Sequence, residues 1–372
     1  MKSIVELEQE YRDLVVQFKD LAEKSEKDET VRVEARKVAQ RSLGAAIVLR
    51  KRYEELATEK PEFSGNVAAY EQQIERWQDK LAKLGSSMNG IPTTTFDDIC
   101  GLEDVKDSIK NYLFALKNPE IAKKYRISTN VGMLMYGPPG TGKTLVAQAI
   151  AHELGVRFFV ITPSTIFGSY VGESERNVRD IFAELRACED GAVLLVDECE
   201  SIFSKRTGET NRAAIGVANQ LLQEMNGAGD TGAERRVIIG ATNMPENIDE
   251  AYLRFKRFSL QFLIDMPNDE ARQKVINMKM KKLPHDEMVL DEMIRVLDEG
   301  YTCADISGII EQCAYKAVEE TRRLSEAAGG NPVPEVKIGV RHFREVMSTF
   351  SKSVPMELVM KYRNFRDSRR NA

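Results

Sequence analysis

The stretch that decides the fold is Gly137-Pro-Pro-Gly-Thr-Gly-Lys-Thr144. It matches G-x-x-x-x-G-K-[ST] at every position, follows the apolar run 131–136 and opens a segment that favours helix. In that context the glycines let backbone N–H groups curl around phosphate, and the start of a helix adds favourable partial charge. Lys143 is expected to reach the β- and γ-phosphates and the Thr144 hydroxyl to coordinate Mg²⁺. The predicted phosphate-binding residues are Gly137, Pro138, Pro139, Gly140, Thr141, Gly142, Lys143 and Thr144.

Two later apolar runs end in polar residues that suit the same chemistry. The run 193–196 leads into Asp197 and Glu198, about 50 residues after the phosphate-binding loop. At the carboxyl end of a buried strand, Asp197 is expected to hold Mg²⁺, and Glu198 to activate the attacking water as a general base. The run 237–242 leads into Asn243, whose amide could touch both the γ-phosphate and that water. A turn-forming role before Met244-Pro245 is an equally open interpretation of Asn243.

The middle of the chain alternates short apolar runs with helical stretches. Strands are expected at 131–136, 158–162, 193–197, 237–242 and 260–264. This alternation predicts an α/β fold with a parallel five-stranded sheet and helices on both faces. Beyond Pro267 the segments 269–281, 286–299, 303–326 and 340–350 read as helices, which predicts a small helical lid. The expected boundaries are 96–266 for the nucleotide-binding part and 267–372 for the lid with its C-terminal helix.

The first 85 residues have a different pattern. Apolar residues recur every three or four positions over 4–21 and again over 67–84, and the stretch 30–58 favours helix. Each outer segment covers under three heptads, so these stripes fit a three-helix bundle or hairpins that pair between subunits better than a long coiled coil. Residues 86–95 are small and polar and contain Pro92, which predicts a linker.

Composition excludes several classes of function. The 372 residues carry 53 Lys plus Arg against 58 Asp plus Glu, a net charge of -5 that argues against a protein that coats nucleic acid. With three histidines, dense histidine-based metal chemistry is not expected. Five cysteines without a C-x-x-C pair fit reduced thiols. No apolar run approaches the roughly 20 residues of a membrane span, and the N-terminus lacks a signal-peptide core. We therefore expect a soluble, cytoplasmic protein.

Taken together, residues 96–370 resemble the AAA family of ATPases within the wider AAA+ group, in the family's order and over nearly three quarters of the chain. Phe96-Asp-Asp-Ile-Cys-Gly-Leu102 looks like the entry motif whose backbone, at Gly101, borders adenine. Gly240-Ala-Thr-Asn243 looks like the first sensor. Gly300-Tyr-Thr-Cys-Ala-Asp305 resembles the second-sensor region, which places Ala304 at the nucleotide. The resemblance implies ATP and Mg²⁺ as ligands.

Three further motifs imply a ring of subunits. Ser169-Tyr-Val-Gly-Glu-Ser-Glu175 resembles the first pore loop, in which Tyr170 and Val171 would grip an unfolded polypeptide. Gln220-Leu-Leu-Gln-Glu-Met-Asn-Gly227 resembles the segment between subunits. Asp249–Phe258 resembles the arginine-finger segment, so Arg254 and Arg257 would reach a neighbour's γ-phosphate. The family often has two adjacent arginines where this chain has Leu253-Arg254, and Arg257 follows the bulky Lys256, so both arginines stay candidates.

The resemblance is closest to the single-module clade of katanin, spastin and the ESCRT-disassembling ATPases, partly through Ser353–Tyr362 near the C-terminus. It implies a homohexameric ATPase that remodels, unfolds or disassembles a protein substrate selected, directly or through an adaptor, by residues 1–85. Whether those residues form a microtubule-interacting-and-trafficking bundle or an intersubunit coiled coil is left open. Two alternatives are the unfolding partner of a separate protease and an ATP-driven nucleic-acid machine. The first lacks an HExxH centre in cis, and the second lacks a basic, aromatic-interleaved stretch.

Overall fold

A computed structural model describes residues 3–22, 29–83, 88–126, 131–167, 173–186, 188, 191–205, 212–227, 236–253, 257–327 and 335–370. By its contacts the chain divides into two units. One unit comprises residues 1–92 with 157–160, and the other comprises 93–156 with 161–372. The boundaries predicted from the sequence stay predictions.

The sheet carries the strand order β1-β3-β4-β5-β2-β6. Its main strands are β2 Val131–Tyr136, β3 Arg157–Ile161, β4 Ala192–Val196, β5 Arg236–Thr242 and β6 Phe258–Leu263. The pairs β4–β5, β5–β2 and β2–β6 are parallel, as strands joined by helical crossovers must be. Every residue of β4 is fully buried, which explains its continuous apolar run. The predicted parallel α/β core is confirmed, with strand bounds within about two residues of those expected.

The linker region contains an element that the sequence did not predict. Residues Met88–Asn89 form the short strand β1, which pairs antiparallel with β3 so that Met88 lies opposite Phe159. A two-residue strand has no alternation to reveal it, and its backbone partner alone defines it.

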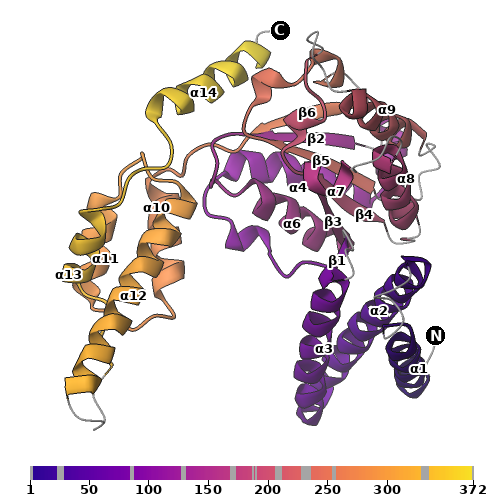
Figure 1. Ribbon diagram of the computed structural model, residues 1–372, viewed down its shortest axis with the longest axis horizontal. Coiled ribbons are helices and arrows are strands. Elements are labelled where there is room, and N and C mark those ends of the chain that lie inside the picture. Colours follow the sequence, from indigo (N-terminus) through magenta and orange to yellow (C-terminus); the bar gives the residue numbers. More distant parts are fainter. Residues whose placement is uncertain are drawn as a thin grey trace. The chain divides into compact units, whose positions relative to one another are not determined.

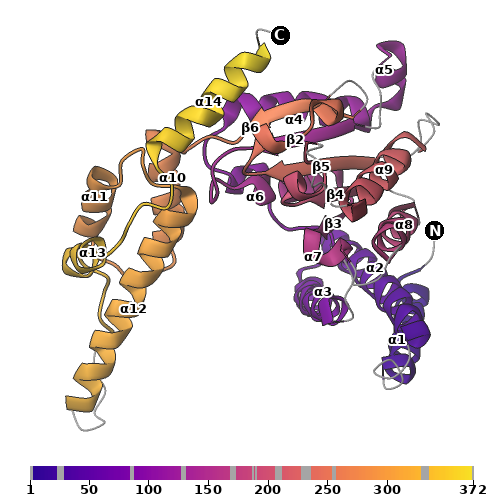
Figure 2. The same cartoon turned by 45° about the horizontal axis from the view of Figure 1, so that its top comes forward.

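Helices surround the parallel strands in both views (Figures 1 and 2). They are α4 Glu103–Lys117, α5 Pro119–Lys124, α6 Lys143–Leu154, α7 Pro163–Ile166, α8 Glu173–Arg186 and α9 Arg212–Gly227. Helix α4 packs against α6, and α8 packs against α9. Short 3-10 turns follow the strands or precede helices: η2 Phe96–Asp98, η3 Cys199–Ser201, η4 Pro245–Asn247 and η5 Glu250–Leu253.

The lid consists of α10 Asp269–Met280, α11 Glu287–Val296, α12 Cys303–Ala327 and α13 Val340–Met347. These helices bury a common core that includes Ile276, Met293, Ile309 and Phe343. The last helix, α14 Met356–Arg370, leaves this group and packs instead against β6 and η4, beside the sheet (Figure 2). The C-terminal helix therefore contacts the α/β part rather than only the lid to which the sequence assigned it.

The N-terminal unit is built from α1 Ile4–Ala22, α2 Glu29–Glu59 and α3 Ser64–Lys83, with the turn η1 Pro61–Phe63 before α3. Helix α2 packs against both of the others, so a three-helix bundle forms within one chain. The Phe18 and Trp77 rings meet edge to face with centroids 4.9 Å apart, and Trp77 Nε1 donates to the Tyr11 hydroxyl at 2.9 Å. None of the described helices is long and apolar enough to cross a membrane.

Candidate nucleotide-binding site

The phosphate-binding loop connects the end of β2 to the start of α6. Its glycines 137, 140 and 142 have φ values of 150°, 75° and 101°, in the region that favours glycine. A Cβ atom on Gly137 would lie 2.2 Å from the Ile264 carbonyl oxygen, so a side chain there would collide with backbone. The backbones of Gly137 and Ile264 approach each other this closely because the loop is folded tightly over the end of the sheet. The loop therefore presents main-chain groups rather than side chains to a ligand.

Lys143 is buried at the start of α6. Its Nζ donates to the carbonyl oxygens of Gly137 at 3.0 Å and Pro138 at 2.8 Å. Burial lowers the pKa of this amine to about 8, while the Asp197 and Glu200 carboxylates act in the opposite direction. A phosphate group would replace the two carbonyls as partner and supply the negative charge that the buried amine lacks. The Lys143 amine is therefore held by the backbone of its own loop.

The second part of the site is the carboxyl end of β4. The backbone N–H of Asp197 donates to the Ile161 carbonyl of β3 at 2.8 Å, and its Oδ1 accepts from the Glu198 N–H at 3.0 Å. Glu198 is exposed and has φ 49°, a left-handed conformation that costs a non-glycine residue about 1–2 kcal/mol. Such strain concentrates at functional sites, where the surrounding structure enforces it. The strain thus adds a structural reason to the expectation that Glu198 acts in chemistry.

Strand register brings the third part, Asn243, to the same edge. Tyr136 of β2 pairs with Thr242 of β5, so the next residues, Gly137 and Asn243, leave neighbouring strands together. The Asn243 Oδ1 atom is buried and has no hydrogen-bond partner within the described part of the chain. An unpartnered buried carbonyl oxygen costs about 1–3 kcal/mol, which a bound ligand or water would recover. Of the two interpretations of Asn243, this orphan oxygen favours the nucleotide contact over the turn.

The lid closes on the loop through the start of α12. The Ala304 N–H donates to the Gly140 carbonyl at 3.0 Å, and a Cβ on Gly140 would lie 2.8 Å from the Ala304 Cβ. Thr302 and Asp305 cap this end of the helix reciprocally, each side chain accepting from the other's backbone N–H at 3.0 Å. The structure thus places Ala304 against the phosphate-binding loop, and its contact with the nucleotide stays a prediction.

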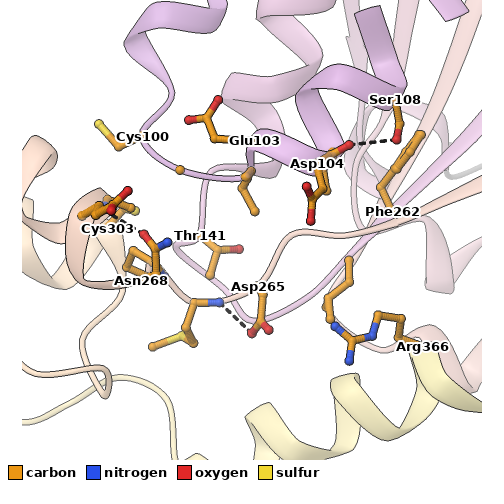
Figure 3. Close-up of a pocket in the computed structure, with 18 of the residues that line it drawn as sticks. Cys100, Glu103, Asp104, Ser108, Thr141, Phe262, Asp265, Asn268, Cys303 and Arg366 are labelled. Atoms are coloured by element: carbon orange, nitrogen blue, oxygen red, sulfur yellow. Dashed lines mark hydrogen bonds between the residues drawn. The ribbon is translucent and has the colours of Figure 1, made fainter. Parts of the chain in front are cut away.

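A cavity of about 1190 Å³ adjoins the loop at Thr141. It is lined by the entry segment, the starts of α10 and α12 and the edge strand β6; Figure 3 shows Cys100, Asn268 and Cys303 around one end and Phe262 at the other. Gly101, with φ 74°, lies in this wall, and a Cβ there would come within 2.8 Å of the Ala271 Cβ. The volume exceeds the roughly 300–1,000 Å³ of an ordinary ligand pocket, so a nucleoside would fit.

Comparison with known proteins agrees with this geometry. Residues 133–266 match the sequence profile of the ATPase family associated with various cellular activities (AAA). The chain contains an AAA ATPase domain. This confirms the family resemblance drawn from the motifs, and the AAA domain is a nucleotide-binding one.

Two AAA relatives give the extent of the similarity. The chain is 33% identical over 290 residues to the Arabidopsis thaliana "Cell division control protein 48 homolog C", covering 77% of this chain and 34% of that protein. It is 32% identical over 280 residues to the Drosophila melanogaster "Fidgetin-like protein 1", covering 74% of this chain and 52% of that protein. The chain thus spans about a third and about half of the length of these two relatives.

The structure describes only part of the pore-loop and arginine-finger segments. Arg254, Tyr170 and Val171 lie outside the described residues. Arg257 is described, and its Nη1 donates to the Ala251 carbonyl at 2.7 Å while its guanidinium carbon lies 5.9 Å from the Tyr252 ring centroid. These contacts belong to its own segment. Within the chain, Arg257 is thus held by neighbours in sequence.

Sequence reasoning missed one residue at the site. Tyr362 of α14 donates its hydroxyl to the Asn243 carbonyl oxygen at 2.6 Å, across 119 positions of sequence. The resemblance of 353–362 to a family helix pointed to this segment but assigned it no role. A hydroxyl that meets a backbone oxygen leaves no motif, so the fold alone reveals the contact.

Proposed function

We propose that this chain is an ATP-hydrolysing AAA motor whose homohexamer remodels, unfolds or disassembles protein substrates through a central pore. The observation that carries the hydrolytic part is the shared sheet edge. There the phosphate-binding loop, the Asp197-Glu198 pair and the orphan oxygen of Asn243 follow adjacent parallel strands. Crevices at the carboxyl ends of such strands are where open α/β sheets bind ligands.

The residues divide the hydrolysis of ATP among them. Loop N–H groups and the Lys143 ammonium bind the phosphates, with Lys143 leaving the carbonyls of Gly137 and Pro138. Glu198 accepts a proton from the attacking water, and Asn243 Oδ1 orients that water against the γ-phosphate. An arginine of an adjacent copy, Arg254 or Arg257, stabilises charge as the terminal phosphate separates.

The chain also offers oxygen ligands for a divalent cation. Thr144 and Asp197 are half-buried at this edge, and a hydroxyl with a carboxylate suits a hard cation such as Mg²⁺. When bound, Mg²⁺ would neutralise charge on the phosphate oxygens of ATP. The donor set therefore fits the metal that the family implies.

The remodelling part of the proposal is supported by the arrangement along the chain of the N-terminal bundle, the pore-loop motif and the ATPase domain. Pore-loop residues Tyr170 and Val171 are proposed to grip the polypeptide, and the bundle in residues 1–85 to select it, directly or through an adaptor. That bundle has its own buried core around Trp77, as a recruiting module requires. Five cysteines without a C-x-x-C pair and the mild net charge of -5 support a reducing, cytoplasmic setting without stable nucleic-acid binding.

The proposal is tested with a substrate-processing assay on a Tyr170→Ala variant. The variant should bind and hydrolyse ATP yet lose the processing of an unfolded polypeptide, because only the grip is removed. The matched control is Tyr315→Ala, a tyrosine exposed on the lid helix α12, which should process normally. Normal processing by Tyr170→Ala would refute threading, whereas a wild-type protein without ATP hydrolysis would refute the motor altogether.

A further inference from the structure

Helix α14 returns from the lid to the carboxyl ends of the strands that carry the site. Four of its side chains contact residues that lie at or after the carboxyl ends of these strands: Tyr362, Arg363, Phe365 and Arg369. None of these residues belongs to a motif for phosphate or metal binding. Their common target raises the question of what the helix does for the hydrolytic residues.

The Tyr362 contact is the most direct. The residue is buried, with 2% of its surface exposed, and its hydroxyl donates to the Asn243 carbonyl at 2.6 Å. Burial raises the pKa of this phenol to about 12, so it remains a hydrogen-bond donor throughout the neutral range. The backbone of Asn243 is thus held by α14 while its side-chain oxygen remains free of protein partners within the described residues.

Two further contacts fix α14 against both sides of the phosphate-binding loop. The Phe365 ring meets Tyr136, the residue before Gly137, edge to face with centroids 5.1 Å apart. Arg363 Nε donates to Asp265 Oδ2 at 2.9 Å. Asp265 follows Ile264, whose carbonyl lies 3.0 Å from the Thr141 hydroxyl of the loop. Tyr362 therefore projects from a helix that is anchored to the loop it would help to align.

A fourth contact reaches the arginine-finger segment. Arg369 lies 3.6 Å from Glu250, which begins the η5 turn before Arg257. Glu250 is largely exposed, so this ion pair contributes little to stability. It nevertheless shows that the helix follows the same edge as far as the segment proposed to serve the adjacent copy.

We propose that Tyr362 is a positioning residue for ATP hydrolysis. By holding the Asn243 carbonyl, its hydroxyl fixes the direction of the Asn243 side chain toward the γ-phosphate and the attacking water. Tyr362 does not touch the nucleotide, so it acts through Asn243. The inference rests on the proposed function, because it assigns Asn243 the contact with the terminal phosphate and the water.

The test begins with Tyr362→Phe in the full chain, which removes the hydroxyl and keeps the ring. We expect kcat for ATP to fall about tenfold, because the Asn243 side chain would be less well directed in the transition state. Affinity for ADP should stay within about twofold, because ADP lacks the γ-phosphate. Affinity for a non-hydrolysable ATP analogue should fall relative to ADP, and this readout does not depend on turnover. The matched control is Tyr315→Phe, which removes the hydroxyl of a tyrosine exposed on the lid helix α12 and outside the nucleotide-binding motifs.

A double-mutant cycle with Asn243→Ala separates positioning from general support. If Tyr362 acts through the Asn243 side chain, Tyr362→Phe should change kcat less than about twofold in the Asn243→Ala background. A structural role would instead lower the rate by the same factor in both backgrounds. Unchanged kcat in Tyr362→Phe, additive losses, or a parallel fall in ADP affinity and melting temperature would each overturn the inference. A wild-type protein that does not hydrolyse ATP would overturn the proposed function, and the inference with it.

Discussion

Lys143 predicts an unusual pH dependence of nucleotide binding. In the nucleotide-free protein burial lowers the pKa of its amine from 10.5 to about 8. Bound phosphate oxygens favour the protonated amine, so the affinity should follow the protonated fraction of the free protein. With a pKa of about 8, that fraction is roughly nine-tenths at pH 7 and roughly one-tenth at pH 9. Affinity for ADP should therefore fall roughly tenfold over this interval.

The same lysine couples stability to pH. Its pKa is lower in the folded protein than in the unfolded chain, so the unfolded state binds more protons between pH 8 and 10.5. The free energy of unfolding should therefore rise through this window, and the burial cost is fully present below pH 8. The difference between the pKa of 10.5 in the unfolded chain and about 8 in the folded protein corresponds to a loss of stability of about 3 kcal/mol at most. The free energy of unfolding should regain about 2 kcal/mol of this loss between pH 7 and pH 9.5. Lys143→Met should abolish this rise.

Isothermal titration calorimetry with ADP at pH 7, 8 and 9 measures the effect. At pH 8, repetition in two buffers of different ionisation heat should show the uptake of about half a proton per ADP. The control is Lys316→Met, which removes a lid lysine paired with Glu345 at 2.6 Å and should leave the dependence unchanged. Affinity that varies less than about twofold, without proton uptake, would refute the reasoning from the buried amine.

Three further predictions concern the loop, its charges and the bundle. Gly137→Ala places a Cβ 2.2 Å from a backbone oxygen, so it should weaken ADP binding more than tenfold and lower the melting temperature in a thermal scan. Asp197→Asn removes a carboxylate that raises the pKa of Lys143, so calorimetry should show the affinity for ADP falling at a lower pH. Phe18→Ala should destabilise the bundle by about 3–5 kcal/mol. Fluorescence of Trp77, the single tryptophan, would report this in urea, while ADP affinity should not change.

The sequence predicted those parts of the fold that are recorded in periodicity and motif. The fully buried β4 is a continuous apolar run, and the loop at 137–144 has its glycines where positive φ occurs. The strand β1 could not be predicted, because two residues carry no period and the pairing with β3 defines it. The return of α14 to the sheet was missed for a related reason. Its contacts join residues about 100 positions apart, such as Arg363 with Asp265, and no local pattern encodes such a pairing.

The residues of the proposed site follow the same division. The position of Asp197 and Glu198 at the end of a buried strand could be predicted because they end an apolar run at a recognisable distance from the loop. The strained backbone of Glu198 and the orphan oxygen of Asn243 are properties of the fold, and they appear only once the strands are in register. Tyr362 required the full tertiary structure.

The central claim is that a neighbouring copy completes an ATP-hydrolysing site, and a mixing experiment tests it most directly. Glu198→Gln retains its arginines and lacks the proposed base, whereas Arg254→Ala/Arg257→Ala retains the base and lacks the proposed fingers. Each protein alone should hydrolyse ATP at less than about a hundredth of the wild-type rate. Mixed in equal amounts, they should regain activity, because about a quarter of randomly formed interfaces pair an intact base with intact arginines. If the mixture stays at the sum of its two parts, the site is not shared between copies and the claim is wrong.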